Sequence, residues 1–194
     1  MEALSAFADA GRLPVPGADP AGRDPSSSPE FRYLLEQMRR RGRGAAPQWD
    51  RVALAAREVL CAQGKHLSAA AYLSIALTRL FRLEGLACGV GVMRDTACLH
   101  WEGLYPRRPR ARANILAFWD DECRLFLTGV QETACGGLTE RAASLRAFLA
   151  LHMDTPPDLE TFARFAEPAP DPKPDASPLR RLAGLFGFGG RKRT

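Results

Sequence analysis

Apolar side chains recur at steps of three and four residues along most of this chain, from Phe31 to Phe165. This spacing places them on one face of an α-helix, because a helix completes a turn every 3.6 residues. Strict alternation of apolar and polar residues, typical of a half-buried β-strand, is missing; Val90 and Val92 alternate for a single step. The pattern predicts an all-α protein, a bundle of about six to seven antiparallel helices with a flexible N-terminal arm and C-terminal tail.

Capping and turn residues divide this pattern into separate helices. Ser27 and Glu30 have the spacing of a capping box, and Pro29 suits a first helical turn. Gly64 is expected to cap the second helix at its C-terminus. Pro156 is expected to begin a short last helix. The expected breaks between helices fall at residues 39–44, 64, 85, 105–109 and 129–137.

Two glycines, Gly85 and Gly89, lie four residues apart in the middle of the helical pattern. Each glycine costs about 1 kcal/mol of helix propensity relative to alanine. Small residues at this spacing let a neighbouring helix approach closely. The pair therefore predicts tight packing between two helices, with a hinge as the alternative.

Composition divides the chain into four parts. Residues 1–27 include a stretch rich in Pro, Gly, Asp and Ser, which predicts a flexible arm. Residues 28–166 hold the helical periodicity and form the expected folded domain. Five prolines within residues 167–178 predict an extended linker. Residues 179–194 form a basic, aromatic tail that is too short to fold alone.

The cysteines and the absence of a long apolar run predict that the protein lies in the cytoplasm. No run of about 18 apolar residues is present, and the N-terminus lacks the basic start of a secretory signal peptide. The cysteine count is odd and no two cysteines lie within four positions, which argues against a disulfide framework and a CxxC zinc pair. These features predict a cytoplasmic protein whose thiols are buried as small apolar groups: Cys61, Cys88, Cys98, Cys123 and Cys135.

Histidines give no indication of a metal site or a general base. His66, His100 and His152 match no metal-binding spacing. His66 falls at a helix start and is expected to be solvated, whereas His100 is expected at the surface or half-buried. His152 lies near a helix C-terminus, where a cation is mildly favoured.

Carboxylates and glycines give no catalytic motif either. Asp120, Asp121 and Glu122 are adjacent on one expected helix, where neighbouring side chains point about 100° apart, so they do not converge. They predict a solvated, partner-facing acidic edge. No phosphate-binding glycine loop or nucleophile elbow is present. The chain is therefore expected not to be an enzyme and to bind no cofactor and no metal.

Basic residues gather in three clusters, within residues 39–43, 107–112 and 180–193, in a chain with a formal net charge of +5. The clusters lack the interleaved aromatic residues and the motifs of nucleic-acid-binding domains, so no nucleic-acid partner is expected. From charge alone, solvated loops are the favoured interpretation of the first two clusters. The second cluster and the tail are nevertheless the exposed candidates for a protein contact. The candidate partner-binding residues are Arg107, Arg108, Arg110, Arg112, Leu182, Leu185, Phe186 and Phe188.

Six short segments carry a resemblance to a known family. In order they are GADP at 17–20, SPEF at 28–31, PQWD at 47–50, GKHL at 64–67, EGLACGV at 84–90 and WEGLYP at 101–106. This ordered series is similar to the N-terminal domain of the ImpA/TssA proteins of bacterial type VI secretion. The likeness covers about residues 17–122. One departure stands out: members usually have an acidic residue and an arginine where this chain has His66 and Ser68.

The resemblance implies a helical, non-enzymatic assembly adaptor. Its implied partners are other type VI secretion proteins, of the baseplate, the sheath or tube, or the membrane complex. Full-length members continue into C-terminal domains that form rings, so the resemblance does not extend ring assembly to this shorter chain. The alternative is a peripheral membrane-surface protein, anchored by the apolar and basic residues of the tail. A weak membrane-surface contact is compatible with both functions.

Overall fold

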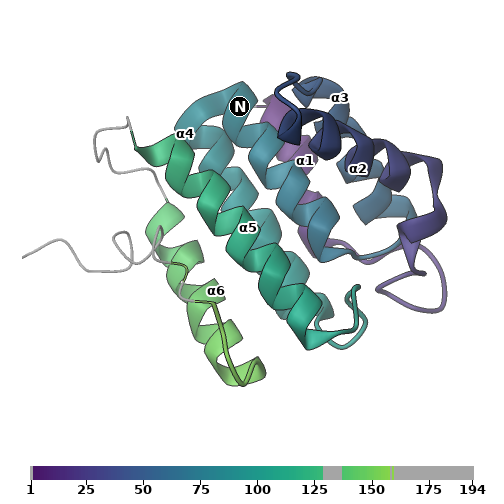
Figure 1. The fold of residues 1–194 in the computed structure, drawn as a ribbon. Helices are drawn as coiled ribbons and strands as arrows, with labels where there is room; N and C mark the ends of the chain where they lie inside the picture. Colours follow the sequence, from purple (N-terminus) through teal and green to yellow (C-terminus); the bar gives the residue numbers. More distant parts are fainter. Residues whose placement is uncertain (1, 129–136, 158, 160–194) are drawn as a thin grey trace, which may run out of the picture.

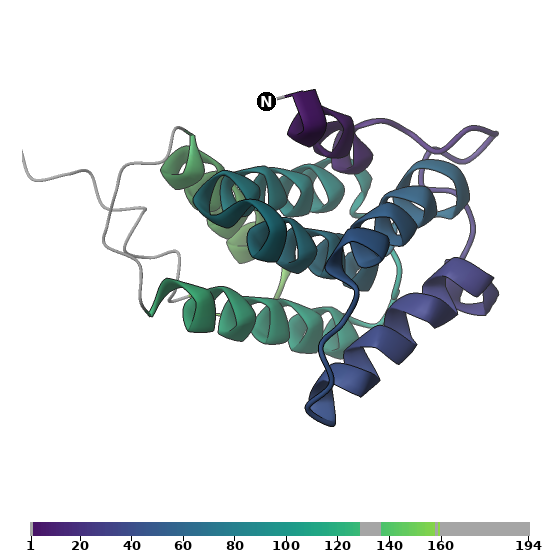
Figure 2. The same cartoon turned by 90° about the horizontal axis from the view of Figure 1, so that it is seen from above.

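The computed structural model describes residues 2–128, 137–157 and 159. Over those residues the chain forms helices and no β-strand, which confirms the all-α prediction. The helices pack as a bundle around a long central element, α4 (Figure 1, Figure 2). The α-helices are α1 (Glu2–Arg12), α2 (Pro29–Gly42), α3 (Trp49–Glu58), α4 (Leu67–His100), α5 (Pro109–Leu127) and α6 (Leu138–His152).

The central element α4 is a hairpin of two helical arms, residues 67–81 and 83–100. Arg82 separates them, with φ 58° and ψ −131°, a conformation that an L-residue adopts only under strain. Gly89 lies directly against Ser74, and Gly85 against the Leu77 carbonyl, so a Cβ on either glycine would collide with the first arm. This confirms the tight packing expected from the two glycines. The break itself falls at Arg82, three residues before the expected position.

The first helix, α1, corrects the prediction of a flexible arm over residues 1–27. It packs along the second arm of α4, where the Cys88 thiol lies 3.7 Å from the Leu4 carbonyl and Gly11 fits against the backbone of Val92. Lys65, which is fully buried, donates from Nζ to the Ala10 carbonyl at 2.8 Å. A helix of this length is marginal by itself, so these tertiary contacts hold it in place.

Two expected caps differ in the structure. Ser28, not Ser27, caps α2, and its hydroxyl accepts a hydrogen bond from the Phe31 N–H at 3.1 Å. Glu30 instead accepts from the side-chain amide of Gln63 at 2.7 Å. After α3 the chain makes a π-helical turn (Val59–Gln63), and Gly64 is extended rather than left-handed. Gly64 is needed because the Arg23 carbonyl lies where a Cβ would be.

The later helices follow the predicted order. α5 and α6 begin and end close to the expected positions, and α6 packs on α4, where Arg141 donates to the Ala87 carbonyl of the second arm. Leu159, expected in a short last helix, is buried in the core. The structure does not describe the rest of that helix, which includes Phe162 and Phe165. It also does not describe the expected linker at 167–178 or the tail at 179–194.

The prediction that the cysteine thiols are buried is confirmed in part. Cys123 is buried, whereas Cys61, Cys88 and Cys98 are half-buried and all four are free thiols. Burial raises the pKa of Cys88, Cys98 and Cys123 above the usual value of a thiol, which keeps them protonated and unreactive. Cys135 lies outside the described residues.

The prediction of a solvated acidic edge at residues 120–122 is wrong for Glu122, which is buried. Its carboxylate is buried between two arginines, 2.5 Å from an Arg41 nitrogen of α2 and 3.6 Å from an Arg79 nitrogen of α4. Asp121 remains exposed and pairs with Arg124 of the same helix at 2.5 Å. Glu122 therefore links three helices, whereas Asp121 contacts only its own helix.

We expect Glu122→Gln to lower the free energy of unfolding by about 1–2 kcal/mol. The amide still accepts from Arg41 but loses the charge that holds both arginines, and their half-exposed guanidinium groups can turn to water. Urea unfolding of the full chain measures the change. Asp121→Asn is the matched control, and its exposed pair contributes less than about 0.5 kcal/mol. Equal effects of the two substitutions would contradict the role of Glu122 as a buried link between three helices.

Candidate interaction site

Three segments far apart in the sequence meet at one end of the bundle through backbone hydrogen bonds. The Lys65 N–H donates to the Ala21 carbonyl and the Leu67 N–H to the Tyr105 carbonyl, both at 2.7 Å. The Tyr105 N–H donates back to the Lys65 carbonyl at 2.9 Å. These three segments, residues 21–23, 63–67 and 104–106, are called the junction below. The junction holds the start of α4 and lies just before the turn that leads into α5.

His66 lies inside the junction, which corrects the expectation that it is solvated. Only 6% of the residue is exposed, and its ring packs on Phe31 with a centroid distance of 4.4 Å. Its Nδ1 accepts a hydrogen bond from the Ser68 N–H at 3.1 Å and so caps α4. Burial lowers the pKa of His66 to about 4, against a weaker opposite effect of the Asp24 carboxylate. The imidazole is therefore neutral at pH 7.

Lys65 and His100 lie where α1 ends. Burial lowers the pKa of Lys65 to about 8, although its ammonium group is hydrogen-bonded to the Ala10 carbonyl. His100, expected at the surface or half-buried, is buried as well, and burial together with the nearby Lys65 charge lowers its pKa. A cation at the C-terminal end of a helix is favourable, so Lys65 stabilises the docked α1.

Arg112, predicted with its neighbours as an exposed partner-binding residue, is only 7% exposed. Its guanidinium donates to the carbonyls of Pro106 at 2.8 Å and Trp101 at 3.0 Å, and it lies 4.3 Å from the centre of the Trp101 ring. Five donors in a planar fork can satisfy several carbonyls of one turn at once. Arg112 therefore holds the turn that precedes α5, a structural role that its spacing in the sequence could not indicate.

Arg107, Arg108 and Arg110 are exposed at the start of α5, beside the junction. Arg107 donates to the Glu102 carbonyl and lies 4.8 Å from the Tyr105 ring centre. No acidic residue occupies the first turn of α5, where the helix dipole disfavours cations. The other predicted partner-binding residues lie outside the described part of the chain: Leu182, Leu185, Phe186 and Phe188.

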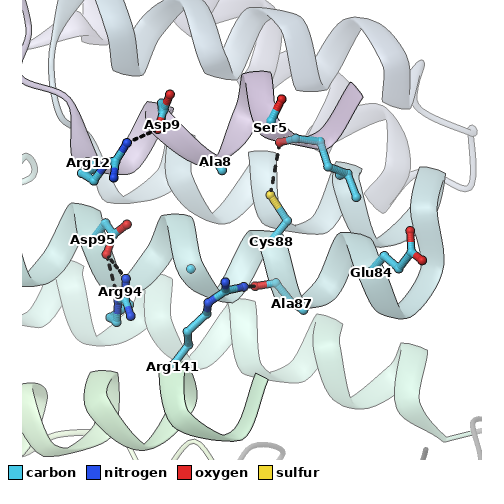
Figure 3. Close-up of a pocket in the computed structure, with 12 residues that line it drawn as sticks. Ser5, Ala8, Asp9, Arg12, Glu84, Ala87, Cys88, Arg94, Asp95 and Arg141 are labelled. Carbon is cyan, nitrogen blue, oxygen red and sulfur yellow. Dashed lines mark hydrogen bonds and ion pairs between the residues drawn. The ribbon is translucent and has the colours of Figure 1, made fainter. Parts of the chain in front are cut away.

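A groove of about 700 Å³ lies between α1, the second arm of α4 and the start of α6 (Figure 3). Its charged side chains largely bind one another: Arg12 lies 2.6 Å from Asp9, and Arg94 lies 2.5 Å from Asp95. Arg141 reaches across from α6 and donates to the Ala87 carbonyl at 2.9 Å. The sequence did not predict this groove, because one of its walls is the unpredicted helix α1.

A second hollow, of about 420 Å³, lies between the junction and the last turn of α6. We call it the aromatic pocket. The Trp101 ring meets the edge of Phe148 at a centroid distance of 5.5 Å, and His152 stacks on Phe148 at 3.9 Å. The carboxylates of Asp19 and Glu102 also line it. Residues 19–21, 98–103 and 148–152 are distant in sequence, so only the fold brings this pocket together.

A comparison with family models relates the junction to known proteins. The model described as ImpA, N-terminal, type VI secretion system, matches residues 13–121, more than half of the chain. The chain belongs to the ImpA N-terminal family. This confirms the resemblance seen in the sequence, and it places the chain among components of the type VI secretion system, a family with assembly roles and no known enzymatic class. The matched range includes all three segments of the junction and leaves out α1 and α6.

A solved structure has the same fold. It is the N-terminal domain, including the conserved ImpA_N region, of the TssA component of the type VI secretion system from Burkholderia cenocepacia. The identity is 23% and the TM-score 0.56, over 86% of this chain and 66% of that one. A search of curated proteins finds no match.

Two further findings concern the part of the chain that the structure describes. None of its helices is long and apolar enough to cross a bilayer. Within the same residues, no three side chains of His, Cys, Asp or Glu gather in a way that could hold a metal ion.

Proposed function

We propose that this chain is a non-enzymatic assembly adaptor of a bacterial type VI secretion system, acting in the cytoplasm on a baseplate, sheath or membrane-complex subunit. Membership of the ImpA N-terminal family supports the system. The observation that carries the proposed contact is the exposed arginine surface of Arg107, Arg108 and Arg110 at the start of α5. These side chains would bind an acidic surface of the partner.

The position of these arginines argues for binding rather than stability. Cations near a helix N-terminus cost a few tenths of a kcal/mol each, because they face the positive end of the dipole. In α2 and α3 an acidic residue in the first turn offsets this cost, Glu30 and Asp50 respectively, but α5 has none. The junction holds the start of α5 in place, so the arginines are presented on a rigid support.

We expect Arg108→Glu with Arg110→Glu to reduce capture of type VI secretion subunits about tenfold or more, since charge reversal turns attraction into repulsion. The measurement is affinity capture of the tagged full chain from its native host, followed by quantitative mass spectrometry. The fold should be unchanged or slightly more stable, because the new carboxylates suit the start of α5.

The matched control is Arg32→Glu with Arg51→Glu, which reverses two exposed arginines in the first turns of α2 and α3. Its capture should equal that of the unmodified chain. The proposed surface is wrong if both double variants lose capture equally. The proposed function is wrong if the unmodified chain recovers lipid or unrelated proteins and no type VI secretion subunit.

A further inference from the structure

The aromatic pocket has an acidic lining in a chain whose net charge is positive. Its lining contains two carboxylates, Asp19 and Glu102, and neither lysine nor arginine. One Asp19 oxygen accepts a hydrogen bond from the Ala21 N–H at 2.9 Å. Among the described residues no cation forms an ion pair with either carboxylate, although the Arg112 guanidinium interacts with the Glu102 charge at longer range. In a chain with a net charge of +5, this pocket is an acidic site with an apolar floor.

The floor of the pocket is apolar and open to solvent. Leu99 is 57% exposed, and Trp101 and Phe148 are half-buried beside it. Guanidinium groups already stack on aromatic rings nearby, Arg112 on Trp101 and Arg107 on Tyr105. Such a pocket suits a peptide that combines arginine with apolar side chains. The groove beside α1 suits such a peptide less well, because three arginines share its lining with three carboxylates, two of which are already paired.

We propose that residues 179–194 of this same chain bind in the aromatic pocket. This segment reads LRRLAGLFGFGGRKRT and contains no acidic residue. Its five cations complement Asp19 and Glu102, and its apolar residues complement the floor formed by Leu99, Trp101 and Phe148. The cations are Arg180, Arg181, Arg191, Lys192 and Arg193, and the large apolar residues are Leu179, Leu182, Leu185, Phe186 and Phe188.

The connecting chain is long enough for binding within one molecule. Leu159 is anchored in the core, and residues 160–178 span about 60 Å when fully extended. At about 3.1 Å per residue, the value for proline-rich linkers, residues 167–178 would reach about 37 Å, more than the length of α6, about 22 Å. The pocket lies at the last turn of α6, from which the chain continues towards this segment. A tether of this length gives an effective concentration in the millimolar range, which favours the intramolecular contact over binding between copies.

A photo-cross-linking residue placed at Leu99 of the full chain tests the proposal. Ultraviolet irradiation followed by peptide mass spectrometry should join position 99 to residues 179–194 within a single chain. The matched control carries the same probe at Leu54 of α3, which is 58% exposed and does not line the pocket. We expect at least about a fivefold higher yield of tail cross-links from position 99 than from position 54.

A second variant tests the charge. Asp19→Asn with Glu102→Gln should lower the yield from position 99 about fivefold, as expected when two cation–carboxylate contacts are lost. Both residues are exposed, and circular dichroism confirms that the variant is folded. Equal yields from positions 54 and 99, or an unchanged yield in the charge variant, would overturn the proposal. In a mixture of ¹⁵N-labelled and unlabelled chains, cross-links that join two copies would overturn the intramolecular assignment.

Discussion

Gly85→Ala is expected to lower the free energy of unfolding by about 3 kcal/mol or more. The two arms of α4 touch at this point, and the added methyl group would overlap the Leu77 carbonyl, a backbone atom that cannot rotate away. Relief of the overlap requires the arms to separate. Because α1, α3, α5 and α6 all pack on α4, separation of its arms would loosen the whole core.

Urea unfolding of the full chain followed by circular dichroism measures this effect. Gly42→Ala is the matched control, because Gly42 lies in the last turn of α2 with no atom close to its missing Cβ. There alanine should be neutral, or more stable by up to about 1 kcal/mol through its higher helix propensity. A Gly85→Ala protein as stable as the Gly42→Ala protein would show that the arms of the hairpin are not in the close contact described.

Acid is expected to destabilise the fold through His66, by about 3 kcal/mol between pH 6.5 and pH 4. The pKa of His66 is lowered to about 4, so the unfolded chain binds a proton at a higher pH than the folded chain does. Folding is therefore increasingly opposed as the pH falls through this window, and the loss is complete below about pH 4. Protonation of Nδ1 also removes the acceptor that caps α4 at the Ser68 N–H.

Unfolding by urea at a series of pH values, for the full chain and for His66→Asn, separates this contribution from that of the carboxylates. Asparagine is a good helix cap that does not titrate, so the variant should lose less stability on acidification. A histidine NMR titration gives the pKa of His66 directly. Identical pH dependence of the two proteins, or a His66 pKa near 6.5, would contradict the prediction.

Short polar side chains such as Ser, Thr, Asp and Asn are the usual N-terminal caps of a helix. Here a neutral imidazole takes that place, buried against Phe31. The junction therefore keeps its hydrogen-bond pattern at pH 7, and we expect the Ser68 contact to be lost only when His66 is protonated, near pH 4.

Local sequence signals were sufficient for the order of helices and for the family. Helical periodicity depends on residues three and four positions apart, so it can be read without knowledge of distant contacts. It predicted α2 to α6 in order. The spacing of Gly85 and Gly89 predicted the close helix contact, because only a missing Cβ allows two backbones to approach so closely. Two of the short segments that carried the family resemblance, residues 64–67 and 101–106, meet at the junction.

The tertiary structure, by contrast, decided which polar side chains are buried and which distant segments meet. His66 and Glu122 are polar residues in segments that look solvated, yet each is buried against partners from distant parts of the chain. Arg112 is buried as well, because the turn that precedes α5 folds back around it. α1 is a helix because the second arm of α4 and the buried Lys65 provide contacts that an isolated segment lacks. The aromatic pocket likewise needs residues from three separate segments. The sequence by itself determined helices α2 to α6 and the family, which follow from local spacing, whereas α1 and the site depend on long-range contacts that only the folded chain supplies.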